Sequence, residues 1–201
     1  MKAAAFLLVV LAAFGAHAAP RPTDPDWPCQ QVKVADVSVA ALWSGPPIEA
    51  YRKTWQQDPL VATWVGELSP RRVPMEQATT RIEAIAKQEG AEKRAKLVAL
   101  FAGLFDTLDS ERASVVAGLS RFGKRQKELA ANLRGEEEAL RAAQSSATPD
   151  DAKVTELTQR LAWDAEVFES RRQSLSFACD VPNAIEQRMF ALARVIQPLL
   201  N

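Results

Sequence analysis

The chain has little of what enzymes use for covalent or acid-base chemistry. Its one histidine, His17, lies in an N-terminal apolar segment that we expect to be removed. A mature chain without histidine excludes Ser-His-Asp and Cys-His nucleophiles, histidine-ligated zinc or iron, and haem with a proximal histidine. The chain has only two cysteines and no C-x-x-C motif. A disulfide between them would also exclude thiolate catalysis and cysteine-ligated metals.

Glycine is sparse, and neither acidic nor basic residues are in excess. The eight glycines are scattered and form neither a G-x-G-x-x-G sequence nor a P-loop, so we expect no nucleotide site and no cofactor. The 25 Lys and Arg residues balance the 25 Asp and Glu residues. Without net charge there is no general attraction for phosphate backbones, so we expect no nucleic-acid partner. A hydrolase built on paired carboxylates is the enzyme class that the sequence leaves open.

The N-terminal segment, residues 1–18, has the pattern of a cleaved secretory signal. Lys2 precedes a short apolar run, and residues 16–18 form the A-x-A sequence that signal peptidase recognises. The run is shorter than the roughly 18 residues of a spanning helix, and no second such run follows. We therefore predict cleavage between Ala18 and Ala19, no transmembrane segment afterwards, and a location in the periplasm or outside the cell.

The two cysteines, Cys29 and Cys179, lie near opposite ends of the exported chain. An oxidising compartment favours a disulfide between such a pair. In the chain-entropy model, closing so long a loop removes about 4–5 kcal/mol of freedom from the unfolded chain. We predict this disulfide, and the alternative is two unpaired buried thiols.

The N-terminal third of the chain changes character at about residue 47. Residues 19–47 are rich in proline and contain two tryptophans, a composition that opposes a long helix. We predict an extended strap here, laid over a helical domain of residues 48–201. That domain begins with two short helices up to Leu68 and a third that starts after Pro74 and ends or bends near Gly90.

Two long helical patterns follow. Residues 91–143 lack proline and repeat apolar residues every three or four positions, which predicts a long helix with a coiled-coil-like seam. The sequence does not decide whether this helix is continuous from Asp109 to Gly123, because glycine inside a helix costs about 1 kcal/mol. After a turn, Thr148 as cap and Pro149 at the first helical position predict a second helix.

The second helix should fold back antiparallel on the first, which gives a hairpin of about residues 91–177. Asn183 followed by Glu186 resembles a capping box, so we predict a separate final helix there. Together these patterns predict an all-α protein. It consists of a helical bundle, a long antiparallel helical hairpin that projects from the bundle, and an extended N-terminal strap held by one disulfide.

The densest basic run comprises Arg121, Lys124, Arg125 and Lys127, with Phe122 inside it. Interleaved bases and aromatics can bind nucleic acid or anionic lipid. Export argues against nucleic acid, however, and Phe122 falls on the predicted seam. Two interpretations remain: a solvated helix face, or a patch where an acidic partner docks.

Trp43 is the other candidate for partner binding, because it precedes a turn of Ser, Gly and two Pro residues. Exposed aromatic side chains concentrate at binding hot spots. A tryptophan beside a turn also serves as a core anchor, and the sequence leaves both interpretations open.

These observations favour an exported helical interaction protein without catalytic activity. It would be an adaptor, an accessory subunit or a chaperone-like module with a protein partner that the sequence does not identify. The alternative is a carrier of a lipid or hydrophobic small molecule in a bundle cavity near Phe101 and Phe105. A carboxylate-based hydrolase is the third hypothesis, and the sequence does not set the oligomeric state.

Overall fold

The computed structural model of the chain describes residues 24–88 and 90–201, which form helices joined by turns, with no strand among them. The predicted all-α class is confirmed. The predicted signal segment and its cleavage site lie outside these residues. Within the two described ranges, none of the helices has the length and apolar character of a membrane span.

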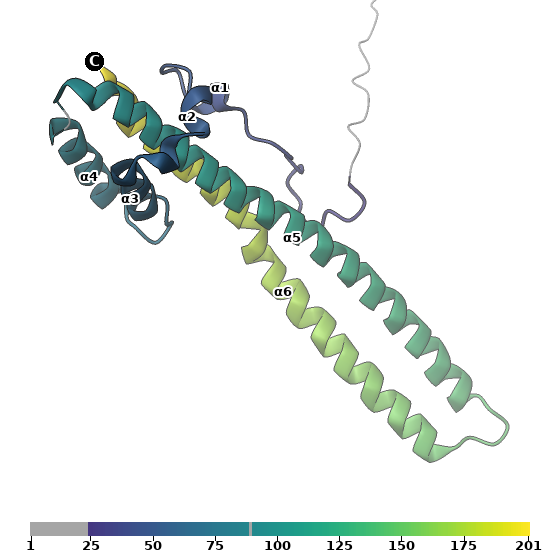
Figure 1. Cartoon of the computed structure of the whole chain (residues 1–201). Coiled ribbons are helices and arrows are strands. Elements are labelled where there is room, and N and C mark those ends of the chain that lie inside the picture. The colour runs from purple at the N-terminus through teal and green to yellow at the C-terminus, as the bar shows by residue number, and fades with distance from the viewer. Residues whose placement is uncertain (1–23, 89) are drawn as a thin grey trace, which may run out of the picture.

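Two long helices form the frame of the molecule, as Figure 1 shows. They are α5 (Lys93–Gln144) and α6 (Asp151–Ile196), which pack against each other along the hairpin. At 1.5 Å per residue, the 52 residues of α5 span about 78 Å. The helix is unbroken from Asp109 to Gly123, so packing on α6 and on the head outweighs the cost of its glycines.

The start of α6 differs from the prediction by two residues. Its N-cap is Asp150, whose carboxylate accepts hydrogen bonds from the amides of Ala152 and Lys153 at 3.0 and 3.2 Å. Thr148 and Pro149 instead lie in the turn. A charged carboxylate is the stronger acceptor for two helix amides, which explains why Asp150 takes the cap.

The separate final helix predicted at Asn183 is wrong, because α6 continues through Pro182 to Ile196. Proline cannot donate the usual backbone hydrogen bond, but the side chains of Cys179, Pro182 and Ile185 are all buried. Their packing holds the two parts of the helix together. Glu186 does not cap a helix start, since its carboxylate accepts a hydrogen bond from Arg112.

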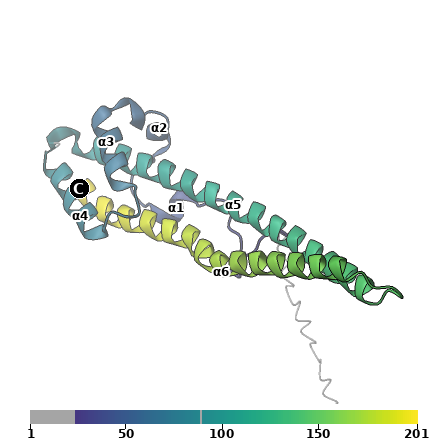
Figure 2. The ribbon, with the colours of Figure 1, turned by 90° about the horizontal axis from the view of Figure 1, so that it is seen from below.

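Short helices gather at one end of the long pair and form a head (Figures 1 and 2). In chain order these are α1 (Val39–Leu42), α2 (Glu49–Arg52), η1 (Trp55–Gln57), α3 (Pro59–Leu68), α4 (Met75–Gln88) and η2 (Gly90–Glu92), with η3 (Gln197–Leu200) after α6. Gly90, with φ of 50°, turns the chain from α4 towards α5, a conformation that glycine adopts without strain. The fully buried side chains of this head include Ile48, Leu68, Ile82, Leu97, Leu104, Leu108 and Ile185.

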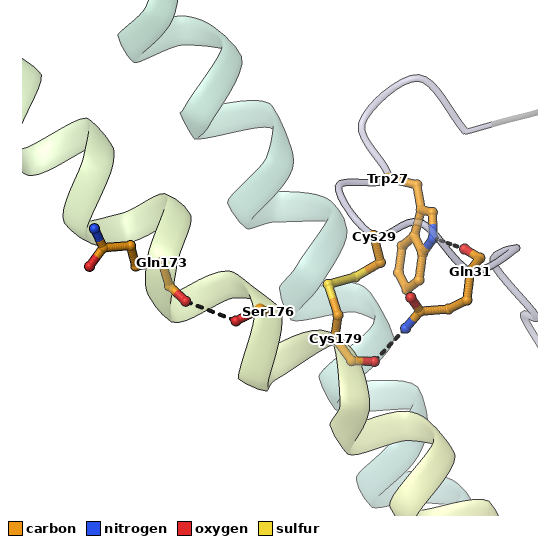
Figure 3. Close-up of a disulfide and its surroundings, with 6 residues drawn as sticks. All are labelled: Trp27, Cys29, Gln31, Gln173, Ser176 and Cys179. Carbon is orange, nitrogen blue, oxygen red and sulfur yellow. Dashed lines mark hydrogen bonds between the residues drawn. A yellow bond between two sulfur atoms is a disulfide. The ribbon is translucent and has the colours of Figure 1, made fainter.

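The strap is present, and its path ends in the short helix α1, which the sequence did not predict. Figure 3 shows the disulfide between Cys29 and Cys179 that joins the strap to α6. Beside it, the Gln31 amide donates to the carbonyl of Cys179. The indole of Trp27 donates to the Gln31 carbonyl at 2.7 Å. The predicted disulfide is therefore confirmed, and hydrogen bonds on both sides of it fix the strap.

A buried arginine of α5 holds the next part of the strap. Arg112 is only 2% exposed, and its guanidinium donates to the carbonyls of Val34 and Ala35 at 2.7 and 3.1 Å. It also donates to Glu186 of α6 at 2.5 Å. One side chain thus joins the strap, α5 and α6, and the carboxylate and carbonyls satisfy a charge that burial would otherwise disfavour.

The first described strap residue, Asp24, is fixed by charge. Lys33 Nζ donates to its carboxylate at 2.6 Å, and the Ser120 hydroxyl of α5 donates to the same oxygen at 3.1 Å. The hydrogen bond from Lys33 is the main reason that the pKa of Asp24 falls to about 2, and the backbone amide of Asp26 adds to it. Asp24 therefore stays ionised, and keeps these contacts, in weakly acidic solution.

Gly123 of α5 is where the strap backbone comes closest to the hairpin. A Cβ added to Gly123 would overlap the carbonyl oxygen of Asp26 and lie 3.1 Å from Pro28 Cδ. Gly135, in the same helix, has open space at the corresponding position. The strap therefore depends on the missing side chain at Gly123, which sequence alone marked only as a weak point of the helix.

We expect Gly123→Ala to lower the free energy of unfolding by about 1–3 kcal/mol, because the methyl group forces the strap backbone away from α5. The matched change Gly135→Ala should raise it by up to about 1 kcal/mol, since alanine is the better helix former and meets no neighbour. Urea unfolding of both variants measures the difference. Equal stabilisation by both changes would contradict the close approach.

Candidate docking surface

Three side chains of the basic run are free for a partner. Arg121, Lys124 and Arg125 are exposed, and none of them forms an ion pair with a residue that the structure describes. Lys127 is also exposed, but its ammonium lies 3.3 Å from Asp26 of the strap. The strap thus engages one of the four cations that the sequence singled out.

The four cations do not all point the same way, because successive helical residues point about 100° apart. Arg121 and Arg125 lie three and seven residues after Gly118, which places all three on one side of α5. Lys124, three residues after Arg121, lies beside it and about 120° around α5 from Gly118. Lys127 faces the strap. Of the four cations, the two arginines therefore lie nearest the side of Gly118.

Next to these arginines lies an apolar groove of about 290 Å³ between α5 and α6. The residues that line it are Val115, Gly118, Leu119, Phe122, Ser174, Leu175 and Ala178. Phe122 is only partly buried, so this part of the predicted seam is open to solvent on the groove side. Two packed helices cannot cover both sides of their own seam, and here no described residue covers this side.

The sequence analysis missed two exposed aromatic side chains of α6, one beside the groove and one about 16 Å along the helix from the lining residue Ser174. Trp163 is 67% exposed and Phe177 is 79% exposed. They are 14 residues apart, close to four helical turns, and thus lie on one side of α6. Phe177 directly precedes Ala178, a lining residue. Their spacing could have been recognised in the sequence. Both residues lie at similar helical angles, away from the seam through Leu161, Phe168 and Leu175.

Trp43, by contrast, is not available to a partner. Its side chain is 6% exposed, its ring stacks on Phe101 with centroids 4.0 Å apart, and its indole donates to the Pro46 carbonyl at 2.8 Å. Of the two interpretations left open by the sequence, these contacts are those of a core anchor.

The aromatic residues expected near a carrier cavity are occupied by neighbours. Phe101 contacts Trp43, and Phe105 lies beneath the guanidinium of Arg52, 5.2 Å from the ring centre. A surface cleft of about 730 Å³ nearby is lined in part by Glu49, Asp106 and Asp109.

The carboxylates of that cleft are unequal. Asp106 accepts a hydrogen bond from Arg52 at 2.5 Å, whereas burial raises the pKa of Asp109. No group of three or more His, Cys, Asp or Glu side chains suited to a metal ion occurs in the described ranges. The pairing with Arg52 makes Asp106 part of the contact between α2 and α5. No other lining residue of the cleft points to a particular reaction.

The hairpin groove therefore combines features that suit binding: an apolar floor, exposed aromatics, and arginines that pair with no carboxylate of the described residues. It contains no thiol or imidazole to act as a nucleophile or base. No protein-family model, curated protein or solved structure matches this chain.

Proposed function

We propose that the protein is an exported interaction protein, an adaptor, accessory subunit or chaperone-like module, that binds another protein through the groove side of its hairpin. One observation carries the proposal: Phe177 stands largely exposed beside an apolar groove, and Trp163 stands largely exposed about 21 Å from it along the same side of α6. Burying a large apolar side chain gains about 1.5–3 kcal/mol, so two exposed aromatics on one side of a helix form a strong potential contact.

The other two hypotheses have less support. A carrier needs an enclosed apolar cavity, and the rings expected to line one, Phe101 and Phe105, pack against Trp43 and Arg52. A hydrolase needs two carboxylates that face a substrate, and Asp106 is already paired with Arg52. Binding through the hairpin would bury Trp163 and Phe177, two large apolar side chains that the described chain leaves exposed.

The direct test places a photo-crosslinking amino acid at position 177 of the protein exported by its own cell, followed by mass spectrometry of the adducts. Position 165 is the matched control, since Ala165 is also exposed but lies about 120° around α6 from Phe177. We expect a protein adduct from position 177 and little or none from position 165. Equal labelling from both positions, or none from 177, would argue against the proposal.

Reversing Lys124 and Arg125 to glutamate should leave the melting temperature almost unchanged, because neither side chain pairs with a carboxylate of residues 24–88 or 90–201 and exposed charges contribute under about 1 kcal/mol. The same double reversal should slow association with the crosslinked partner and reduce its dependence on salt, since charges at an interface rim act mainly on the association rate. Thermal melts and stopped-flow binding at two salt concentrations measure both effects. An unchanged association rate in low salt would show that this stretch is only a solvated helix surface.

A further inference from the structure

We infer that the groove between α5 and α6 binds one amphipathic helix of another protein, with apolar side chains in the groove and carboxylates along the edge formed by α5. The inference rests on the proposed function and specifies the chemistry of the partner. Three observations carry it: the way the head covers the same side of the hairpin, the spacing of the exposed aromatics, and the exposed arginines beside the groove.

The groove continues a side of the hairpin that is covered in the head. On α6, Arg188 lies 14 residues after Ser174 and therefore on its side of the helix. Its guanidinium donates to the carbonyls of Leu68 and Val73, at the end of α3 and just before α4, at 2.5 and 2.8 Å. The chain's own helices thus cover this side of α6 in the head.

The same holds for α5. Glu111 lies seven residues before Gly118 and pairs with Arg71 of the α3–α4 connection at 3.0 Å. One turn further along α5, the apolar floor begins at Val115, and no described residue covers it. Figure 1 shows α3 and α4 on one side of the long pair and the strap on the other. The groove is therefore the place where a third helical layer is present in the head and missing in the hairpin.

The spacing of the apolar side chains favours a helix as the occupant. One stripe of α6 has residues at intervals of three or four, the pattern that packs against a helix. It consists of the apolar residues Trp163, Val167 and Phe177, with Ser170 and Ser174 between them. From Trp163 to Phe177 this stripe is about 21 Å long, which a docked helix of about 14 residues would match. The serines in its middle are small enough to let another helix backbone approach closely.

Exposed arginines lie on both sides of the groove. On the α5 edge, the guanidinium of Arg121 folds back to within 3.9 Å of where a Cβ on Gly118 would lie, and Arg125 follows one turn later. Neither has a carboxylate partner among the described residues. On the α6 side, Arg171 is exposed and lies three, four and seven residues before the lining residues Ser174, Leu175 and Ala178, which places it on the groove side of that helix. A docked helix with carboxylates towards α5 satisfies these arginines, and one with lysines there is repelled.

The probe for the experiment is a displayed library of amphipathic helices of about 18 residues, each with the same leucine stripe and with Glu or Lys varied independently on both flanks. Selection is made on the disulfide-bonded mature protein. We expect enrichment of helices with glutamate rather than lysine on at least one flank. The affinity of the enriched peptides is then measured by fluorescence anisotropy.

Three variants assign the binding to the groove. Gly118→Leu fills the groove without a backbone clash, since only the Arg121 side chain lies within 4 Å of the added atom, and should weaken binding by about tenfold or more. Arg121→Glu with Arg125→Glu should reverse the preference from Glu-flanked to Lys-flanked peptides. Lys124→Glu makes the same charge change about 120° around α5 from Gly118 and should alter affinity by less than about twofold.

Melting curves of the variants show that each remains folded. The inference is overturned if the enriched peptides show no charge preference, or if Gly118→Leu binds them as the wild type does. It is also overturned if Lys124→Glu weakens binding as much as the arginine reversals. These failures leave the proposed function intact where position 177 still crosslinks to a protein, and absence of crosslinks from position 177 contradicts the proposed function itself.

Discussion

Cys179→Ser lowers the free energy of unfolding by about 2–5 kcal/mol, the usual effect of removing a native disulfide from a small exported domain. The bond joins residues 150 positions apart, so its loss frees almost the whole unfolded chain. In the folded protein, its loss leaves residues 24–36 of the strap held by hydrogen bonds and ion pairs, among them those of Asp24, Gln31 and Arg112. Urea unfolding of variant and wild type gives the difference.

The control for this result is the partner cysteine. Cys29→Ser should cost the same free energy, and the double variant should cost no more than either single one, because each change removes the same bond. Thiol labelling of the denatured, unreduced wild-type protein should find no free cysteine. Two labelled thiols in the exported protein, or a loss below about 1 kcal/mol in both single variants, would contradict the stabilising role of the bond.

Trp43→Ala lowers the free energy of unfolding by about 3–5 kcal/mol, the range for removing a large aromatic side chain from a core. The ring of Trp43 stacks on Phe101 with an angle of 9° between the planes, and its loss leaves both a cavity and an unpaired Pro46 carbonyl. The matched control is Trp163→Ala, because Trp163 is 67% exposed and should change stability by less than about 0.5 kcal/mol. Equal effects of the two changes in chemical unfolding would show that Trp43 is not a core anchor.

Much of the fold could be predicted because periodic apolar residues and cap residues act locally. The helices α4 and α5 follow from their periodicity, and the cap at Asp58 followed by Pro59 marks the start of α3. The error at Pro182 has a different origin. A proline followed by a capping-box pattern indicates a helix start, but the burial of Cys179 and Ile185 on either side depends on tertiary packing, which local patterns do not contain.

The candidate site was predicted only in part, for a similar reason. The basic run stands out in sequence, yet only the folded strap separates Lys127, which contacts Asp26, from Arg125, which contacts no carboxylate of the described chain. The groove depends on how far the head extends along the hairpin, and no local pattern sets that. Trp163 and Phe177 could have been found, because their spacing defines a second apolar stripe beside the seam on α6.

The disulfide also determines what proteolysis of the hairpin can do. The turn between α5 and α6, residues 145–150, is exposed throughout and stands at the far end of the hairpin from the head. A protease that cuts there produces two pieces, one with Cys29 and the other with Cys179, and these remain covalently joined. The cut protein would keep its head and its groove as one covalent molecule while the disulfide is intact, whereas a nick combined with reduction leaves the two halves of the hairpin held together by packing alone.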